Sequence, residues 1–306
     1  MSDSQVPQQP LITVVIPAYN YASTLARAAQ SVLGQLDENS ELLIIDDGSS
    51  DATPDVIDAL KLGYPERFRS IRKENGGLAS VRNLGIAEAR GEWLVFLDAD
   101  DQMAGGALQA LQVHIAAHPE TRMVIGGHVS VFEDGRRRSH AADPVPDEPM
   151  ARVRAYLLDK RLAISNGACA MHRDVFSSGN YPEHFRNSED IPVFAQVLAR
   201  YPVSRIDAVL ALIYKHGDSL RHHTGHGRAV GTQLVDEVFR RLPDSLQGLR
   251  QAFHVQRCLS LFRSAYLMGD TEQARQYFCA AITSDWSVLF NFSYSRKALR
   301  LFTWRR

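Results

Sequence analysis

The N-terminal third of the chain alternates short apolar runs with segments of helical periodicity. Between the runs, Leu25, Ala28 and Val32 recur at the spacing of one helix face, and residues 78–90 continue in the same way. The runs themselves are short enough for buried strands, and they are Leu11–Ile16, Leu42–Ile45, Phe68–Ile71 and Trp93–Leu97. Strands that alternate with helices are typical of a mainly parallel sheet flanked by helices, so the pattern predicts a Rossmann-like α/β fold.

The rest of the chain changes character twice. Val129–Glu133 followed by the turn Asp134-Gly135 predicts a β-hairpin, and the proline-rich stretch 143–149 predicts an irregular loop. From about residue 226, apolar residues recur at helical spacing almost to the C-terminus, which predicts a helical appendage. We therefore expect an α/β domain over residues 1–225 and a helical region with a basic amphipathic tail over residues 226–306.

Composition narrows the classes of partner and compartment. The 34 basic and 35 acidic residues nearly cancel, so no chain-wide field attracts nucleic acid, and we expect no nucleic-acid partner. The three cysteines are far apart and form no CxxC pattern, which argues against a disulfide framework and favours a reducing compartment. The polar N-terminus lacks the features of a signal peptide and no apolar run has the length of a membrane span, so we expect a cytoplasmic protein.

Polar side chains follow three of the predicted strands. Residues 17–20 read PAYN, residues 46–48 read DDG and residues 98–101 read DADD. Ligands of open parallel sheets bind beyond the carboxyl ends of the strands, so these three sets are expected to meet in one crevice. Carboxylates gathered at one edge repel one another unless a cation neutralises them, and oxygen ligands favour Mg²⁺ or Mn²⁺. For Asp98 and Asp100 we favour this metal interpretation, whereas Asp51 is better explained as the cap of a turn and helix.

Three motifs in this order resemble the nucleotide-binding half of family 2 glycosyltransferases: VVIPAYN, IDDGSSD and NGGLASVRNLGIAEARGEWLVFLDADD. The resemblance implies a GT-A fold, with a nucleotide-binding half at about residues 10–128 and an acceptor half at about 129–225. It implies that Arg82 lies near the base or near the aspartate that reads the base, and that Asp98 contacts the ribose and Asp100 the metal and diphosphate. The other residues that it places at the nucleotide are Pro17, Tyr19, Asn20 and Asp47. Tyr19 has the alternative of being an ordinary half-buried aromatic.

The second half of the chain supplies a candidate base. Glu189-Asp190 follows the segments NGACAMHRDVF and GNYPEHFRNS, which resemble the acceptor side of the same family. By this resemblance Asp190 is the general base and Glu189 a positioning residue, and an acceptor hydroxyl does need a base to become a good nucleophile. The acidic pair can also begin the helix that continues through residues 193–197. In YKHGDSL, the resemblance makes His216 a metal ligand, although the nearby His222, His223 and His226 also fit a mobile lid.

The resemblance implies a metal-dependent, inverting transfer of a sugar from a UDP- or dTDP-linked donor to an acceptor hydroxyl. The implied context is the assembly of a bacterial surface polysaccharide or lipopolysaccharide, with a glycan or lipid-linked glycan as acceptor. A nucleotidyltransferase on a related fold and a non-catalytic nucleotide-sugar-binding module are the alternatives.

The C-terminal tail has its own pattern. Basic residues at 296, 297, 300, 305 and 306 are interleaved with apolar residues at 299, 301, 302 and 304. Such a segment can lie on the anionic cytoplasmic face of the inner membrane, which predicts a peripheral membrane contact. It can equally be a terminal helix that packs on its own domain and keeps a solvated basic face.

Overall fold

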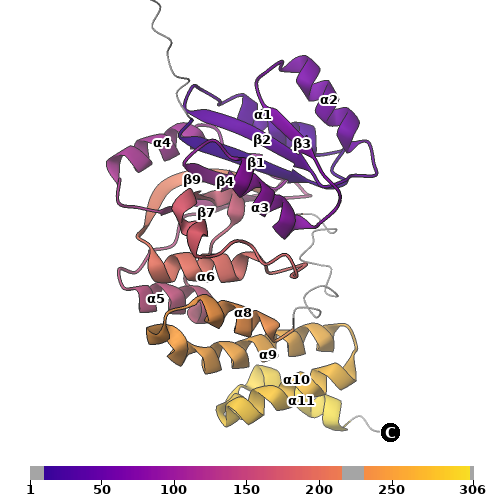
Figure 1. Cartoon of the computed structure of the whole chain (residues 1–306). Coiled ribbons are helices and arrows are strands. Elements are labelled where there is room, and N and C mark those ends of the chain that lie inside the picture. The colour runs from indigo at the N-terminus through magenta and orange to yellow at the C-terminus, as the bar shows by residue number, and fades with distance from the viewer. Residues whose placement is uncertain (1–9, 216–230, 304–306) are drawn as a thin grey trace, which may run out of the picture.

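A computed structural model describes residues 10–215 and 231–303 of the chain (Figure 1). Its strands are β1 (Ile12–Ala18), β2 (Ser40–Asp46), β3 (Arg69–Arg72), β4 (Trp93–Phe96), β5 (Gln102–Met103), β6 (Met123–Phe132), β7 (Arg137–His140), β8 (Cys169–His172) and β9 (Val203–Lys215). Within the described ranges they form one nine-stranded sheet in the order β3-β2-β1-β4-β8-β6-β9-β5, with β7 paired to β6. The first four positions, β3-β2-β1-β4, are all parallel. This confirms the predicted α/β fold with a mainly parallel N-terminal sheet.

Helices cover both faces of the sheet. They are α1 (Leu25–Leu33), α2 (Thr53–Gly63), α3 (Leu78–Glu88), α4 (Ala107–Ala117), α5 (Pro149–Arg154), α6 (Asp190–Arg200), α8 (Gln233–Arg241), α9 (Arg250–Leu267), α10 (Thr271–Ser284) and α11 (Phe292–Thr303). One core contains the buried residues of α1, α2 and α4, and the other contains those of α3, α6 and α8. The sheet therefore separates two apolar layers.

The alternation of side chains along β1 builds both layers at once. Val14 and Ile16 belong to the core with α1, while Val15 between them belongs to the core with α3. Helix α3 lies close to the sheet because residue 85 is a glycine: a Cβ atom there would be 2.8 Å from a methyl carbon of Val15. The carboxyl ends of β1, β2 and β4 consequently meet at one edge, as the register of Ala18 with Asp46 shows.

Beyond β4 the sheet becomes mixed. β8 runs antiparallel between β4 and β6, and the long β9 pairs with β6 in parallel and with β5 in antiparallel fashion. The predicted hairpin is confirmed, since β6 and β7 pair around the turn at Gly135, which has a φ of +81°. The sequence patterns did not predict β5, β8, β9 or α4.

The C-terminal helices form two groups. Helix α8 packs against α6, and its residues Leu234 and Val238 belong to the core of the α/β layer. Helices α9, α10 and α11 bury a separate core that includes Phe262, Phe278 and Ala298. Figure 1 places these three helices at the end of the molecule opposite to α1 and α2. The helical appendage is therefore present, while the boundary near residue 225 stays a prediction. In the described ranges, every helix falls short of the length and apolarity that a bilayer crossing demands.

Candidate functional site

A cleft with a volume of about 540 Å³ opens at the carboxyl edge of β1, β2 and β4. The loops after these strands line it together with residues of the segments 75–82, 164–166 and 186–190, the last of which leads into α6. Most of the predicted site residues line it: Pro17, Tyr19, Asp47, Arg82, Asp98, Asp100, Glu189 and Asp190. Folding thus brings the donor-side motifs and the candidate base into a single cavity. Tyr19 is 46% exposed there, which leaves its ring accessible for stacking.

Asp47 anchors one wall of the cleft. Its carboxylate accepts hydrogen bonds from the backbone N–H groups of Gly76 (2.9 Å) and Gly77 (2.8 Å) and pairs with the Lys73 ammonium at 2.6 Å. The Asn75 side-chain amide donates to the Asp47 carbonyl at 3.0 Å. Asp47 therefore fixes the loop 73–77 over the end of β2. Its contact with a nucleotide base stays a prediction.

Two polar residues near the cleft organise the loop after β2. The Asn20 side-chain oxygen accepts from the backbone N–H groups of Ser50 (2.8 Å) and Asp51 (3.3 Å), and Asn20 itself has a φ of 60°. Asn20 is not among the residues that line the cleft, so its nucleotide-binding role stays a prediction. The Asp51 carboxylate accepts from the N–H groups of Ala22 (3.1 Å) and Thr53 (2.9 Å), so it caps the turn before α2 as expected. The N-cap residue of the helix itself is Ala52.

Arg82 connects the two sides of the cleft. Its guanidinium pairs with Glu189 at 2.5 Å and with Asp98 at 3.5 Å, and it lies 5.3 Å from the ring centroid of Tyr181. Asp47 takes its bonds from the loop 73–77, and the position of Arg82 near the base or near this aspartate stays a prediction. Burial raises the pKa of Glu189, and the Arg82 cation opposes that rise. Burial alone would lower the pKa of Arg82. The Glu189 carboxylate, acting together with Tyr181, Asp98 and Asp190, outweighs burial and raises that pKa.

Hydrogen bonds from Arg27 and from the backbone of Tyr214 fix the acidic loop after β4. The Asp101 carboxylate is buried and accepts the backbone N–H of Tyr214 at 2.8 Å. The Arg27 guanidinium donates to the Asp100 carbonyl at 2.5 Å and stacks over the Tyr214 ring at 3.8 Å. Burial, together with the charges of Asp98 and Asp100, raises the pKa of Asp101 to about 8. Asp98 and Asp100 of this loop line the cleft and contribute two carboxylates to it.

The carboxylates of this loop show whether the residues present suit the predicted metal. A divalent cation beside Asp98 and Asp100 would relieve the repulsion between these carboxylates, which adds to burial in raising the pKa of Asp101. Carboxylate oxygens suit Mg²⁺ or Mn²⁺. In the described ranges, however, no three His, Cys, Asp or Glu side chains gather so as to hold an ion. The two aspartates thus fit a metal that takes further ligands from substrate phosphates. His216, His222, His223 and His226 lie outside the described residues, so the His216 ligand stays a prediction.

The candidate base lines the same cleft as the acidic loop. Asp190 is the first residue of α6 and also lines the cleft, so both positions considered for it from the sequence occur together. Glu189 directly precedes the helix and makes no side-chain capping bond, because its carboxylate is paired with Arg82. The catalytic role of Asp190 and the positioning role of Glu189 stay predictions.

The structure adds one basic residue that the sequence interpretation did not single out. Arg186 lines the cleft, and its guanidinium donates to the Gly76 carbonyl at 3.1 Å. It thereby joins the segment before α6 to the loop that Asp47 anchors. In the sequence, Arg186 could be noticed only because it lies within GNYPEHFRNS. A single arginine there shows no periodicity or motif spacing that would indicate a role.

Comparison with known proteins agrees with this geometry. The sequence pattern described as glycosyl transferase family 2 matches residues 13–179, which is more than half of the chain. The minor teichoic acid biosynthesis protein GgaA of Bacillus subtilis (strain 168) is 35% identical over 144 residues, covering 42% of this chain and 32% of GgaA. The matched region spans less than half the length of this and other curated relatives.

Two solved structures share the fold over nearly the whole chain. Staphylococcus aureus TarS 1–349 in complex with UDP-GlcNAc superposes with a TM-score of 0.59 at 16% identity, covering 95% of this chain and 79% of TarS. The mannosyltransferase PcManGT of Pyrobaculum calidifontis, in complex with GDP-Man and Mn²⁺, gives a TM-score of 0.56 at 16% identity, covering 96% and 84%. At these identities the likeness establishes the fold alone, which is GT-A.

Proposed function

The protein belongs to glycosyl transferase family 2, and we propose that it transfers a sugar, with inversion, from a UDP- or dTDP-linked donor to an acceptor hydroxyl. The observation that carries the proposal is the shared cleft. Asp190 at the start of α6 faces the same cavity as Tyr19 and Asp47 at the nucleotide end and Asp98 and Asp100 at the acidic loop. In this proposal one cleft therefore binds the donor and its leaving group and also contains the base.

The residues divide the reaction between them. Tyr19 stacks on the base, and Asp47 accepts a hydrogen bond from its ring N–H. Asp190 takes the proton of the acceptor hydroxyl as that oxygen attacks the anomeric carbon from the face opposite the nucleotide, which inverts the configuration. General-base assistance of this kind contributes about 10²- to 10⁴-fold to the rate. Glu189, fixed by Arg82, holds the start of α6 and therefore the position of Asp190.

A divalent cation held by Asp98 and Asp100 would supply the charge that stabilises the departing nucleoside diphosphate. Mg²⁺ and Mn²⁺ both suit these oxygen ligands. Support for Mn²⁺ comes from the solved PcManGT complex, whose fold this chain shares. His216 is our candidate for a further ligand.

The acceptor in this proposal is a glycan or lipid-linked glycan of the bacterial surface, including lipopolysaccharide. Support comes from GgaA, a minor teichoic acid biosynthesis protein, and support for a UDP-linked donor comes from the TarS complex with UDP-GlcNAc. An enzyme of this kind would work at the cytoplasmic face of the inner membrane, in peripheral contact with it through the C-terminal region. The proposal places residues 10–128 at the donor and residues 129–225 at the acceptor.

A two-step experiment tests the function. Nucleotide sugars are first screened for protection of the full chain against thermal unfolding with Mn²⁺ present, because a bound donor stabilises the native state. Donors that protect are then incubated with glycan acceptors, and the released nucleotide and the anomeric configuration of the product are measured. Release of nucleoside diphosphate with an inverted product supports the proposal. Pyrophosphate release from a nucleoside triphosphate indicates a nucleotidyltransferase, and protection without any transfer indicates a non-catalytic binding module.

A further inference from the structure

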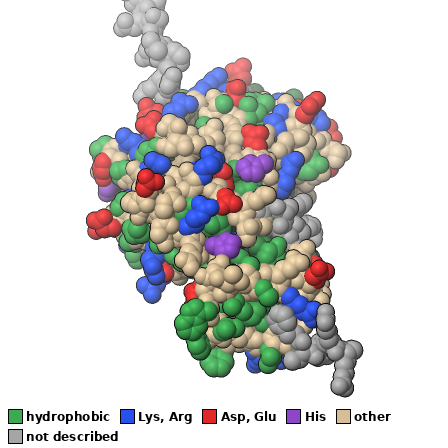
Figure 2. Space-filling view, turned by 60° about the horizontal axis from the view of Figure 1, so that its bottom comes forward, with side chains coloured by type: hydrophobic (Ala, Val, Ile, Leu, Met, Phe, Trp, Pro, Cys, Tyr) green, Lys and Arg blue, Asp and Glu red, His purple; other side chains and the backbone are tan. Residues whose placement is uncertain are grey.

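The C-terminal helices carry a concentration of exposed apolar side chains. In the described part of the chain, every exposed Phe or Trp lies between residues 286 and 292. Five large apolar residues of the short helix η5 (Trp286–Phe290) and of α11 are between 50% and 90% exposed, and we call them the C-terminal apolar surface: Trp286, Leu289, Phe290, Phe292 and Leu299. Figure 2 shows hydrophobic side chains gathering on the lower lobe of the molecule. Exposed apolar patches of this kind mark sites of interaction.

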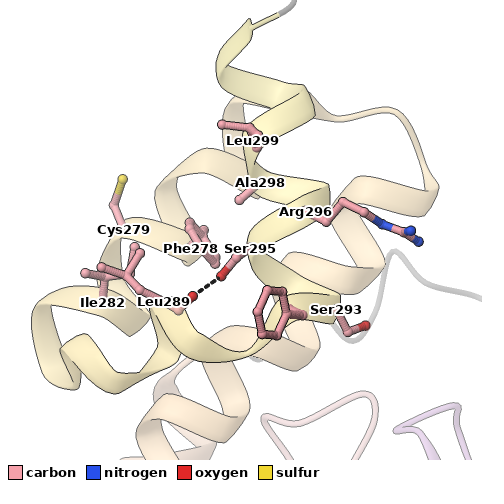
Figure 3. A pocket seen from close by; sticks show the side chains of 10 residues that line it. Phe278, Cys279, Ile282, Leu289, Ser293, Ser295, Arg296, Ala298 and Leu299 are labelled. Atoms are coloured by element: carbon pink, nitrogen blue, oxygen red, sulfur yellow. Dashed lines mark hydrogen bonds between the residues drawn. The ribbon is translucent and has the colours of Figure 1, made fainter.

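The surface borders a groove. A cavity of about 820 Å³ is lined by side chains of α10, η5 and α11, including Phe278, Ile282, Leu289 and Leu299 (Figure 3). Arg296 also lines the groove, but its exposed side chain points away from the apolar side chains labelled in Figure 3. Unlike the cleft at the acidic loop, the groove has no carboxylate in its lining, so it is suited to apolar contact rather than to sugar transfer.

The exposed residues are not needed to fold the C-terminal helices. Helix α11 packs on α9 and α10 through Ala298 and Leu301, which are buried in the separate core. This fits the interpretation of the tail as a helix that packs on its own domain. Leu299 and Phe292 lie outside this core and remain 64% and 90% exposed. A second apolar face is therefore left over after folding is complete.

The charges around this face are mainly positive, with Asp285 at the start of η5 as an acidic neighbour. From residue 286 to the C-terminus the sequence contains basic residues at 296, 297, 300, 305 and 306 and no acidic residue. Arg296 and Arg300 are exposed on α11 itself. Apolar side chains that enter a bilayer interface, flanked by basic side chains that meet anionic headgroups, form the pattern of a peripheral membrane contact. A second copy of the same face would instead set basic groups against basic groups.

We propose that the C-terminal apolar surface docks on an anionic lipid bilayer, with Trp286, Phe290 and Phe292 entering the interface and Arg296 and Arg300 meeting the headgroups. This inference rests on the peripheral membrane contact in the proposed function and locates that contact on residues 286–300, upstream of the extreme tail. Docking of this surface would keep the cleft close to an acceptor that is anchored in the same membrane.

Co-sedimentation of the full chain with lipid vesicles tests the docking separately from sugar transfer. Vesicles of phosphatidylglycerol mixed with phosphatidylcholine are compared with vesicles of phosphatidylcholine alone, at low and high salt. In the variant F290S/F292S we expect the partition coefficient on the anionic vesicles to fall by at least about tenfold. The matched control L62S/V113S removes two apolar residues that are 86% and 66% exposed on α2 and α4, and we expect it to bind as the parent does.

The basic residues are tested in the same assay. R296Q should weaken binding about fivefold at low salt and less at high salt, and R137Q on the β7 hairpin is its control. Transfer to a soluble acceptor should be unchanged in F290S/F292S, so that failure of docking and failure of the proposed function are distinguishable.

Three results overturn the inference: no preference of the parent chain for anionic vesicles, equal binding by F290S/F292S, or an equal loss in L62S/V113S. Self-association of the parent that F290S/F292S abolishes, with vesicle binding unchanged, would assign the surface to a second copy instead.

Discussion

Replacement of Arg82 by methionine removes the cation at which the two sides of the cleft meet. Arg82 is 2% exposed, and its partner Glu189 is 6% exposed. Their ion pair of 2.5 Å is therefore shielded from water, whereas the second partner, Asp98, is only 3.5 Å away on a more exposed side chain. Methionine keeps an unbranched apolar stem but carries no charge. The variant leaves the Glu189 carboxylate buried without its cation.

The expected loss follows from this burial. Removal of one partner of a buried ion pair costs about 3–5 kcal/mol, because the other charge remains desolvated. For a domain of this size, each kcal/mol lowers the melting temperature by about 2–4 °C, so R82M should melt about 6–20 °C below the parent near pH 8. The control R205M breaks the exposed pair of Arg205 and Asp207 and should cost at most about 1 kcal/mol.

The loss should also depend on pH. Burial already raises the pKa of Glu189, and Arg82 is the main influence that opposes the rise, so the pKa of Glu189 should rise further in R82M. A carboxyl group with a raised pKa in the folded state binds its proton more tightly there than in the unfolded chain. Stability is therefore lost as the pH rises through that folded-state pKa. The deficit of R82M relative to the parent should be smaller at pH 5 than at pH 8.

Differential scanning calorimetry of the parent, R82M, R205M and the double variant R82M/E189Q at both pH values measures these effects. The double variant should regain part of the lost stability, because no uncompensated carboxylate remains. The reasoning is refuted if R82M loses no more than R205M, or if its deficit is the same at pH 5 and pH 8.

Three further variants test other parts of the site and fold. D190N should leave donor binding near normal by calorimetry and reduce turnover about 10²-fold or more, and unchanged turnover would remove Asp190 from the mechanism. D100A should abolish the dependence of nucleoside-diphosphate binding on Mn²⁺, while D51A, outside the cleft, should retain it; equal metal dependence in both variants would show that the metal site is misplaced. G85A should lower the unfolding free energy by about 1–3 kcal/mol, because the new methyl group overlaps Val15, and a stability equal to the parent's in urea titration would contradict this close packing.

Sequence periodicity predicted the parallel part of the sheet because that part is built from local patterns. Strands β1, β2 and β4 are continuous apolar runs that are buried on both faces, as in Val14, Val15 and Ile16. The edge where their carboxyl ends meet follows from parallel pairing alone, which is why the motifs at that edge could be expected in one cleft.

The mixed part of the sheet depends on contacts that no local pattern carries. Strand β9 has exposed and half-buried residues over its first half and acquires its place by pairing with β6, some 80 residues earlier in the chain. The short β5 is held by two register pairs with β9. In the site, the pairing of Arg82 with Glu189 spans 107 residues of sequence, so the motif around Arg82 gave no indication of this partner.

The balance of charge in the cleft bears on how a diphosphate can be bound. The lining contains more carboxylates than cations: Asp47, Asp98, Asp100, Glu189 and Asp190 against Arg82 and Arg186. Lys73 compensates Asp47, and Arg82 is committed to Glu189 and Asp98. Among the lining cations of the described residues, Arg186 differs in that its guanidinium donates to a backbone carbonyl, that of Gly76. The diphosphate of the proposed donor would add repulsion to this cleft, and the proposed cation at Asp98 and Asp100 would offset that repulsion.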